Sequence, residues 1–345
     1  MTDSLEIAQV RETSDRRMAR SAQVYRPLIL AAIGIVLFFG VGTLVISWKS
    51  GVWTWPTIAS GETVLQMSLF LAVVAFGQGL VMLTGGLDLS VPGMIALSAS
   101  IVAVYVSFME GNQAIAIVVA LVVCLIFGLI NGLLVATLKA PAFIVTLAMS
   151  GVLEGLSLLI TYGRKAPESP ADLITLFSNS GKILNTNIGI PALLFFVVGI
   201  VGFLIQARSR FGRNVYLLGS SLESARIAGR PVNFLQVAIY GVSGLGAGIA
   251  GLMLLGLSGN AQLSLGTEWL MPSIAAVLVG GTMIGSGRGY WQNTFAAGFL
   301  LMAVTIVILA TGLPQGWKQV LYGVIVLIAL LATRPDRALR SRRRK

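Results

Sequence analysis

The sequence predicts an all-α polytopic membrane protein of about ten membrane-spanning helices, some of them broken. Hydrophobic residues make up 56% of the 345 residues and charged residues 11%, whereas an ordinary globular domain has about 25% charged residues. The mean hydropathy of +0.89 is correspondingly high. Apolar runs of about twenty residues, the length of a helix that crosses a bilayer, recur along the chain. Glycine and proline interrupt some of these runs, as in transporters whose helices are broken within the membrane.

The apolar runs divide the chain into two tails and one membrane domain. Residues 1–26 are polar and contain no apolar core of the kind that a cleaved signal peptide has. We expect them to form a cytoplasmic tail, followed by a transmembrane domain at 27–333 and a basic cytoplasmic tail at 334–345. The ten expected spans lie at residues 27–48, 63–84, 91–109, 114–138, 142–162, 190–207, 233–257, 269–286, 292–312 and 315–333.

The distribution of basic residues predicts the orientation of the spans. With the N-terminus in the cytoplasm, the inner tails and loops hold nineteen lysines and arginines and the outer loops hold five. Such an excess marks the cytoplasmic side, so we expect both termini there. The outer loop 163–189 carries a short apolar patch, residues 173–177, suited to the membrane surface or to a partner outside. The other long loop, 208–232, is expected on the inner side.

The charge and the rare residue types exclude several kinds of site. The formal net charge of +11 would suit a nucleic acid, but the basic residues lie at the two ends and between apolar runs rather than along one soluble face. We therefore expect no nucleic-acid partner. Cys124 is the only cysteine and lies in an apolar run, and the chain has no histidine. No disulfide framework, metal site or cofactor is expected.

The stretch MLTGGLDLSVPGM places one carboxylate among helix breakers. Gly85, Gly86 and Pro92 interrupt an apolar run around Asp88, and such breaks occur in a membrane only where the backbone is buried in protein or lines a cavity. We expect a helix to begin near Ser90, with Pro92 in its first turn. Asp88 then lies just ahead of a helix N-terminus, either as a capping carboxylate or as a polar residue of a translocation pathway; the two roles are compatible.

Two features of the sequence bear on whether ATP or an ion gradient drives this protein: a second carboxylate in an apolar run and the absence of a nucleotide-binding motif. Glu154 lies in the middle of the fifth span, and because an unpaired carboxylate near the bilayer centre costs about 2.5 to 3.5 kcal/mol, we expect it inside the bundle, in packing or in the pathway. The phosphate-binding pattern G-x-x-x-x-G-K-[ST] is absent, since the only Gly-Lys pair, Gly181-Lys182, precedes an isoleucine. ATP would therefore act through another chain. The alternative is an ion gradient that uses Asp88 and Glu154.

The inner loop contains the segment SSLESARIAGRP, which predicts a short isolated helix. Ser220 and Glu223 have the spacing of a capping box, and Gly229 and Pro231 provide a stop. A helix of two turns is unstable alone in water, so it must dock on its own bundle or on another chain, unless the segment is only a connector. One narrow face comprises Leu222, Ala225 and Ala228, and Glu223, Arg226 and Arg230 can pair around its edge.

Four ordered stretches resemble the ribose-type sugar permeases of bacterial ABC importers. GGLDLSVPG is similar to the family's Gly-Gly-Ile-Asp-Leu-Ser-Val-Gly signature, although Pro92 interrupts it. The other three are NGLLVATLKAPAFIVTLAM at 131–149, FGRNVYLLGSSLESARIAGRPV at 211–232, and AAVLVGGTMIGSGRGYWQNTFAAG at 275–298. Together the matches extend from about residue 60 to about residue 330. Trp291 is bulkier than the residue usual in the family and is expected to repack the inner end of the ninth span.

The resemblance implies import of a monosaccharide across the bacterial inner membrane by a transport subunit that is not itself an enzyme. It implies an ATPase on the cytoplasmic face, an external substrate-binding protein, and a second permease chain, identical or different. A permease for branched-chain amino acids or nucleosides in the same superfamily is the first alternative, and an ion-driven carrier the second. The expected pathway residues are Gly85, Gly86, Asp88, Ser90, Asn131, Phe143, Thr146 and Glu154. The expected ATPase-coupling residues are Gly212, Arg213, Ser221, Leu222, Glu223, Ala225, Arg226 and Gly229.

An internal repeat is also expected. LDLSVPGMIALSA at 87–99 and AQLSLGTEWLMPSIAA at 261–276 share a Leu-Ser pair followed by glycine and a helix of small apolar residues. The predicted topology puts them on opposite sides of the membrane. They favour two related halves of inverted orientation, spans two to five and spans seven to ten.

Overall fold

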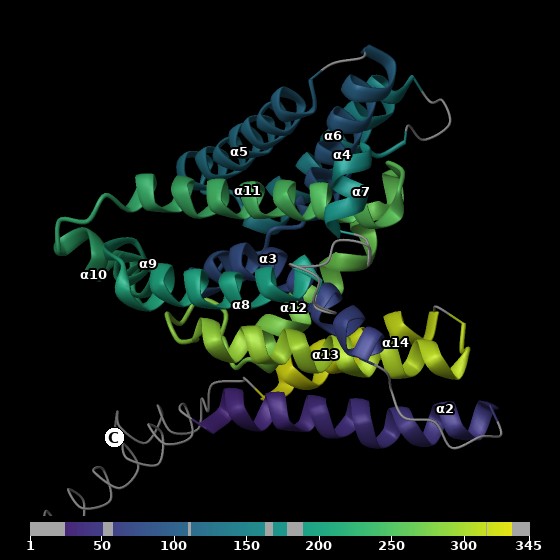
Figure 1. The fold of residues 1–345 in the computed structure, drawn as a ribbon. Coiled ribbons are helices and arrows are strands. Elements are labelled where there is room, and N and C mark those ends of the chain that lie inside the picture. Colours follow the sequence, from purple (N-terminus) through teal and green to yellow (C-terminus); the bar gives the residue numbers. More distant parts are fainter. Residues whose placement is uncertain are drawn as a thin grey trace, which may run out of the picture.

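The computed structural model describes residues 25–50, 58–109, 112–162, 168–177, 189–314 and 316–332, and these form a bundle of helices. Most long helices lie side by side, with the short helices α9 and α10 at one end (Figure 1). After a helical stretch at 25–36, the elements are η1 (Leu37–Val41), α2 (Gly42–Ser50), α3 (Ile58–Leu83), α4 (Val91–Met109), α5 (Gln113–Leu138), α6 (Ala142–Thr161), α7 (Ala171–Phe177), α8 (Ile190–Phe203), η2 (Leu204–Arg208), α9 (Arg210–Ser220), α10 (Leu222–Ile227), α11 (Val232–Ser258), η3 (Leu263–Gly266), α12 (Thr267–Val279), α13 (Trp291–Thr311) and α14 (Gly316–Ala332).

The all-α membrane class is confirmed. Seven helices of the described residues are long and apolar enough to cross a membrane, and three shorter apolar helices lie at Val91–Ser107, Leu263–Val279 and Gly316–Leu331. These ten segments fall where the ten spans were expected. Because three of them are short, a count of ten complete crossings stays a prediction.

The expected end of the eighth span is wrong. The span was placed at 269–286, but α12 ends at Val279 and the chain then turns tightly. Gly281, Gly285 and Gly287 have positive φ angles of 84°, 64° and 60°, which favour glycine over residues with a side chain. These glycines keep the mean hydropathy of the segment high, although each of them permits a turn. Hydropathy alone therefore placed the end of the span too late in the chain.

Small residues let α5 and α11 pack closely at the centre of the bundle. A Cβ atom added to Gly128 of α5 would lie 2.5 Å from the Tyr240 carbonyl oxygen, and one added to Gly244 of α11 would lie 2.5 Å from the Cys124 carbonyl oxygen. Such contacts are too short for any side chain. Close backbone approach through glycine is a common means of helix association in membranes, where the lipid supplies no hydrophobic drive.

The packing pairs the helices as two related halves would. α5 packs on α11, as α13 packs on α3; α4 packs on α6, as α12 packs on α14. The first helices of the two halves, α3 and α11, run in opposite directions: Gly77 lies against Ser243, and the earlier Val73 lies against the later Gly246. This arrangement agrees with the repeat of spans two to five and seven to ten and with its inverted orientation.

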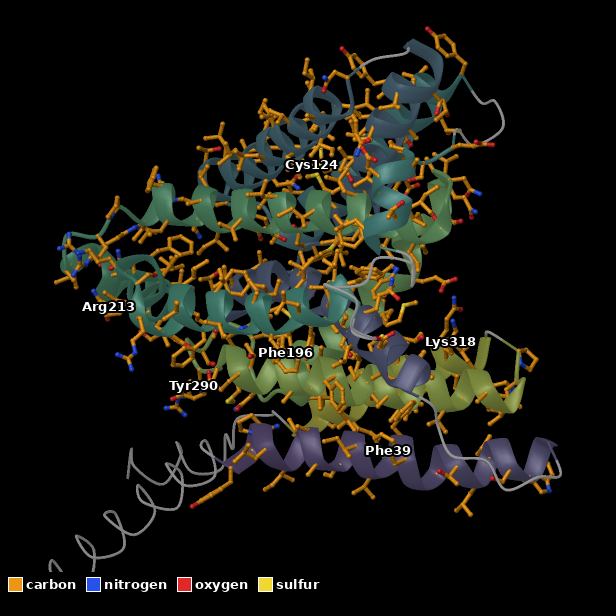
Figure 2. The ribbon with its side chains drawn as sticks, in the orientation of Figure 1. Phe39, Cys124, Phe196, Arg213, Tyr290 and Lys318 are labelled. Carbon is orange, nitrogen blue, oxygen red and sulfur yellow. The ribbon has the colours of Figure 1, made fainter. Side chains whose placement is uncertain are left out.

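Basic residues from separate loops gather at one end of the bundle. The Arg26 guanidinium donates a 2.7 Å hydrogen bond to the Val279 carbonyl, which brings the start of the first helix to the loop after α12. Figure 2 shows Arg213 and Tyr290 at this end and Lys318 toward the other. At the latter, Lys318 forms an ion pair of 3.6 Å with Glu268. The tails, 1–24 and 333–345, and most of the outer loop lie outside the described residues.

The apolar patch of the outer loop packs on the chain itself. It forms α7, whose Leu173 and Phe177 are buried, and the amide of Gln66 in α3 donates a hydrogen bond to the Phe177 carbonyl. A side chain at Gly256 of α11 would collide with the Leu173 carbonyl. The bundle thus covers two residues of the patch, whereas Ile174 is 36% exposed, so contact of this side with the membrane surface or an external partner stays a prediction.

Candidate functional site

The loop after α12 holds the end of α3 at the break between α3 and α4. α3 ends at Leu83, and Gly85 has a φ of 93°, which turns the chain back toward the bundle. The last carbonyls of α3 would lack partners within their own helix. Instead, the Gly285 amide donates to the Met82 carbonyl at 3.0 Å and the Gly287 amide donates to the Leu83 carbonyl at 3.3 Å. The loop after α12 thus caps the helix that leads into the break.

Asp88 lies at the centre of the break and accepts three hydrogen bonds. One carboxylate oxygen accepts from the Ser90 amide at 3.0 Å and from the Ser90 hydroxyl at 2.5 Å, and the other accepts from the Ser243 hydroxyl of α11 at 2.7 Å. Asn131 of α5 donates from its amide nitrogen to the Ser90 oxygen at 2.9 Å. All four side chains are buried, with Asp88 only 1% exposed. We name Asp88, Ser90, Asn131 and Ser243 the Asp88 cluster.

Thr146 of α6 joins the same break through the backbone. Its hydroxyl accepts from the Leu89 amide at 3.0 Å and lies 3.1 Å from the Leu87 carbonyl, to which it can donate. As expected, α4 begins at Val91 with a proline in its first turn. Asp88 lies just ahead of the helix, as expected, but its carboxylate accepts from the amide of Ser90, the residue before α4, and from no amide within the helix in the described structure.

The structure therefore brings together six of the eight expected pathway residues. Asp88, Ser90 and Asn131 are joined by hydrogen bonds, Thr146 binds the backbone of the same break, and the two glycines lie in the turn that precedes them. Ser243 was missed; its signal is a lone hydroxyl in the glycine-rich stretch GVSGLGAG of an otherwise apolar helix. The cluster fixes the break to α5 and α11. Since its side chains are buried, a pathway through it would require the helices to move.

Two expected pathway residues lie elsewhere. Phe143 is half exposed on α6, and Glu154 is exposed on the same helix, where the Ser150 hydroxyl donates to its carboxylate at 3.3 Å. The expectation that Glu154 faces the interior of this chain's bundle is wrong. The buried positions of α6 are occupied by Leu153 and Ser157. Glu154 follows Leu153 directly and therefore points about 100° away from the buried face. The energetic cost is that of a carboxylate that faces lipid. On this exposed face of α6, a second chain would cover Glu154.

The inner loop contains two helices where one was expected. α9 presents its apolar side to the bundle, with Val215 and Leu218 buried, and α10 follows after a single residue. The N-cap of α10 is Ser221, whose hydroxyl accepts from the Ser224 amide at 3.1 Å. The expected capping box at Ser220 is wrong, because the Ser220 hydroxyl donates to the Leu217 carbonyl of the preceding helix. The expected stop at Gly229 is confirmed by its φ of 68°.

α10 docks on its own bundle by one residue and leaves its outer side free. Ala225 is fully buried, whereas Leu222 is half exposed and Ile227 is 80% exposed. At 100° per residue, Glu223 and Ile227 lie opposite Ala225. The expected narrow face is thus reduced to Ala225, and Glu223 makes no ion pair with either arginine of the segment in the described part of the chain.

α9 connects this outer side to the break. Glycine at position 219 is required because a Cβ there would collide with the Leu83 carbonyl and lie 2.8 Å from the Gly287 Cα. The Tyr216 hydroxyl donates to the Gly289 carbonyl at 2.8 Å, and burial raises the pKa of this phenol. Gly212 is equally confined, against the Gln206 carbonyl, and the exposed Arg213 donates to the Arg208 carbonyl at 2.9 Å. α9, which is followed closely by α10, is thus in contact with the end of α3 and with the loop after α12.

Three further sequence features can be placed in the structure. Among the described residues no group of three or more histidine, cysteine or acidic side chains is placed to hold a metal ion. Cys124 is buried, with its sulfur 3.6 Å from the Met94 carbonyl. Trp291 is also buried at the start of α13, where its indole donates to the Gly199 carbonyl at 2.8 Å and its ring meets Phe76 edge to face.

Comparison with known proteins agrees with this architecture. The chain is 29% identical over 275 residues to the ribose import permease protein of Escherichia coli K12, covering 80% of this chain and 85% of that one. It is 34% identical over 267 residues to the ribose import permease protein of Bacillus subtilis, covering 77% and 82%. It is 27% identical over 271 residues to the fructose import permease protein of Rhizobium meliloti, covering 77% and 75%. Residues 61–330 match the family model described as branched-chain amino acid transport system / permease component, and the chain belongs to this family of membrane transport subunits.

Proposed function

We propose that this chain is the membrane-spanning permease subunit of an ABC importer for a monosaccharide. The observation that carries the proposal is its similarity to permeases named for ribose and fructose, over three quarters or more of both chains. The family description names branched-chain amino acids, which keeps that substrate class as the alternative. Three relatives named for sugars favour a sugar.

The proposed partners are a separate ATPase on the cytoplasmic face, an external substrate-binding protein and a second permease chain. The outer side of α10 supports the first, because it carries Glu223 and the 80% exposed Ile227 and is not covered by the chain's own bundle. The open face of α6 supports the last. Nothing occupies the space within 4 Å of a Cβ at Gly151 or Gly155, and Glu154 on the same helix is exposed.

The proposed orientation has both termini in the cytoplasm of a bacterial cell and the chain in the inner membrane. The clustering of the described basic residues from separate loops at one end of the bundle supports it. The proposed coupling route runs from α10 through α9 to the end of α3 and the Asp88 cluster. An ion-driven carrier is less well supported, because both Asp88 oxygens are already taken by donors of this chain.

Uptake by reconstituted vesicles tests the proposal. Vesicles that hold the permease, its ATPase and its binding protein should take up labelled ribose or fructose only with ATP, and an ionophore should not stop them. Labelled leucine tests the alternative substrate class. Sugar uptake that persists without the ATPase and collapses with the ionophore would contradict the ABC assignment.

Variants on the exposed side of α10 test the coupling route. Glu223→Arg and Ile227→Asp change side chains that lie away from the bundle, so the protein should fold and insert normally while ATPase co-purification and uptake fall together. Ser224→Ala is the matched control, since it changes an exposed side chain beside them. Ala225→Trp is a poorer probe because Ala225 is buried against the bundle. Normal co-purification and uptake in both outward variants would mean that α10 is only a connector.

A further inference from the structure

A cavity of about 450 Å³ lies beneath α10, at the end of the bundle where the basic residues gather. It is enclosed by the turn after α3, the end of α5, the start of α6, α10 and the start of α11. Its polar lining consists of the side chains Thr84, Lys139, Arg226, Gln236 and Tyr240. The Asp88 cluster lies deeper in the bundle and contributes none of its four side chains to this lining.

The cavity carries two positive charges and no negative one. Lys139 and Arg226 both line it, no acidic side chain does, and neither cation makes an ion pair within the described residues. The Gln236 amide adds a further group that can donate. Because both cations line the same cavity and have no counter-charge there, an anion inside it would be attracted by both.

A buried hydroxyl also lacks a partner there. Tyr240 is 3% exposed and its hydroxyl makes no hydrogen bond in the described part of the chain. Buried polar groups are nearly always paired, and an orphan at the wall of a cavity indicates a ligand or ordered water. The hydroxyl lies near the turn after α3, because a Cβ at Gly86 would collide with it. The Tyr240 side chain also lines the cavity, so a rotation of this side chain would bring its hydroxyl to an acceptor inside.

The backbone at Lys139 points to a function for its side chain. This residue ends α5 in the left-handed conformation, with a φ of 51°. Glycine or asparagine is usual at such a helix end, and a lysine there is strained. Strained residues of this kind persist where the function of the site requires them. The strained residue here, Lys139, carries one of the two cations that line the cavity.

We propose that this cavity binds a phosphate group, carried by an anionic lipid headgroup or free in solution. Two cations and a phenol hydroxyl match the charge and the acceptor oxygens of phosphate, and hydrogen bonds of this kind are stronger than neutral ones. Leu138 and Phe143, next to the cavity in the chain, are 66% and 50% exposed and offer an apolar surface to acyl chains. With the proposed orientation, the site opens at the inner leaflet, where basic pockets between helices bind headgroups.

Binding to the purified permease in neutral detergent tests the proposal and distinguishes the sources. The arms are phosphatidylglycerol, phosphatidylcholine and inorganic phosphate, with chloride at equal ionic strength as the reference. We expect a rise of the thermal midpoint and retention of lipid in native mass spectra with phosphatidylglycerol, and less of both with phosphatidylcholine. An equal rise with inorganic phosphate would identify the free anion as the ligand. No response in any arm overturns the proposal.

Variants locate the site. Lys139→Gln and Arg226→Gln should each weaken phosphatidylglycerol binding about fivefold, as expected for one basic residue near a headgroup, and Tyr240→Phe about twofold to fivefold. Arg288→Gln, an exposed cation of the loop after α12 that does not line the cavity, should bind as the parent does.

One variant separates binding from folding. Lys139→Gly relieves the strained backbone, so it should raise the midpoint of the lipid-free protein and yet lose the response to phosphatidylglycerol. Parent-like binding by Lys139→Gly and Arg226→Gln overturns the assignment of the cavity. These measurements use neither ATPase nor sugar, so their failure is distinct from a failure of the proposed transport function.

Discussion

Removal of the Asp88 carboxylate should destabilise the bundle more than any other single polar change in the break. In Asp88→Ala the Ser90 amide, the Ser90 hydroxyl and the Ser243 hydroxyl lose their common acceptor. A buried donor left unpaired costs about 1 to 3 kcal/mol. The amide cannot turn away, whereas the two hydroxyls can re-aim at backbone carbonyls. We therefore expect the free energy of unfolding to fall by about 3 to 5 kcal/mol.

Milder changes at the same place should rank below it. Ser243→Ala removes one donor and leaves one Asp88 oxygen unpaired, which costs about 1 to 3 kcal/mol. Asp88→Asn retains an oxygen for Ser90, and its new amide can donate to the Ser243 hydroxyl, so a loss of about 1 kcal/mol is expected. The matched control is Ser98→Ala, a buried serine of α4 that donates only within its own helix, to the Ile95 carbonyl at 3.1 Å.

The assay is reversible unfolding in mixed micelles, followed by far-ultraviolet circular dichroism as the denaturing detergent is increased. Uptake in reconstituted vesicles is measured on the same preparations. The expected order of destabilisation is Asp88→Ala, then Ser243→Ala, then Asp88→Asn. An Asp88→Ala protein that unfolds at the same midpoint as Ser98→Ala would refute the view that the cluster holds the break to α11.

Three further changes have distinct expected outcomes. Gly128→Val should destabilise or prevent folding, because overpacking costs about 1 to 3 kcal/mol or more, whereas Gly151→Val on the open face should leave unfolding within about 0.5 kcal/mol of the parent; equal effects in micelle unfolding would contradict the packing. Glu154→Gln should fold and unfold as the parent does, since the carboxylate contacts only the Ser150 hydroxyl, and uptake then reports whether the charge matters. Tyr216 binds its proton more tightly when folded, so its contribution to stability is complete below the ordinary phenol pKa of about 10 and is lost as pH rises above it. Tyr216→Phe should lack this alkaline loss, as thermal midpoints between pH 9 and pH 11 would reveal.

Local chemistry explains what could be predicted from the sequence. The break was predictable because its glycines and Pro92 act on their own backbone, and the start of α4 follows from them. The ten apolar segments were predictable because hydropathy over twenty residues needs no knowledge of neighbours. The inner loop was harder. One helix face is indicated there by the spacing of Phe211, Val215 and Leu218, which signals α9. The helix has only eleven residues and lies among arginines, so the sequence predicted a loop there.

The unpredicted features depend on contacts that are distant in the chain. Ser243 is 155 residues from the aspartate that it binds, and no local pattern links the two. Glu154 follows a buried leucine, and whether its own position faces inward depends on a rotation of α6 that only tertiary packing sets. Ser220 and Ser221 are both competent N-caps. The choice between them depends on where α9 ends, because the Ser220 hydroxyl is already used there.

The two breaks are each held by the opposite half of the bundle. Asp88 in the first break binds Ser243 on α11, the first helix of the second half. The second break is the segment between α11 and α12. Its Gly266 rests on α4, because a Cβ there would lie 2.6 Å from the Pro92 Cα. The halves therefore cannot slide past each other without disturbing one of these contacts. The breaks differ in their access to water: Asp88 is buried, whereas Gln262, which precedes the second Leu-Ser pair, is exposed and donates to Asn260 at 2.7 Å. Separation of the halves would open little buried polar surface at the second break, whereas at the first it would break the buried hydrogen bond between Ser243 and Asp88, so the Asp88 cluster sets the larger barrier and lies on the side where α9 and α10 approach.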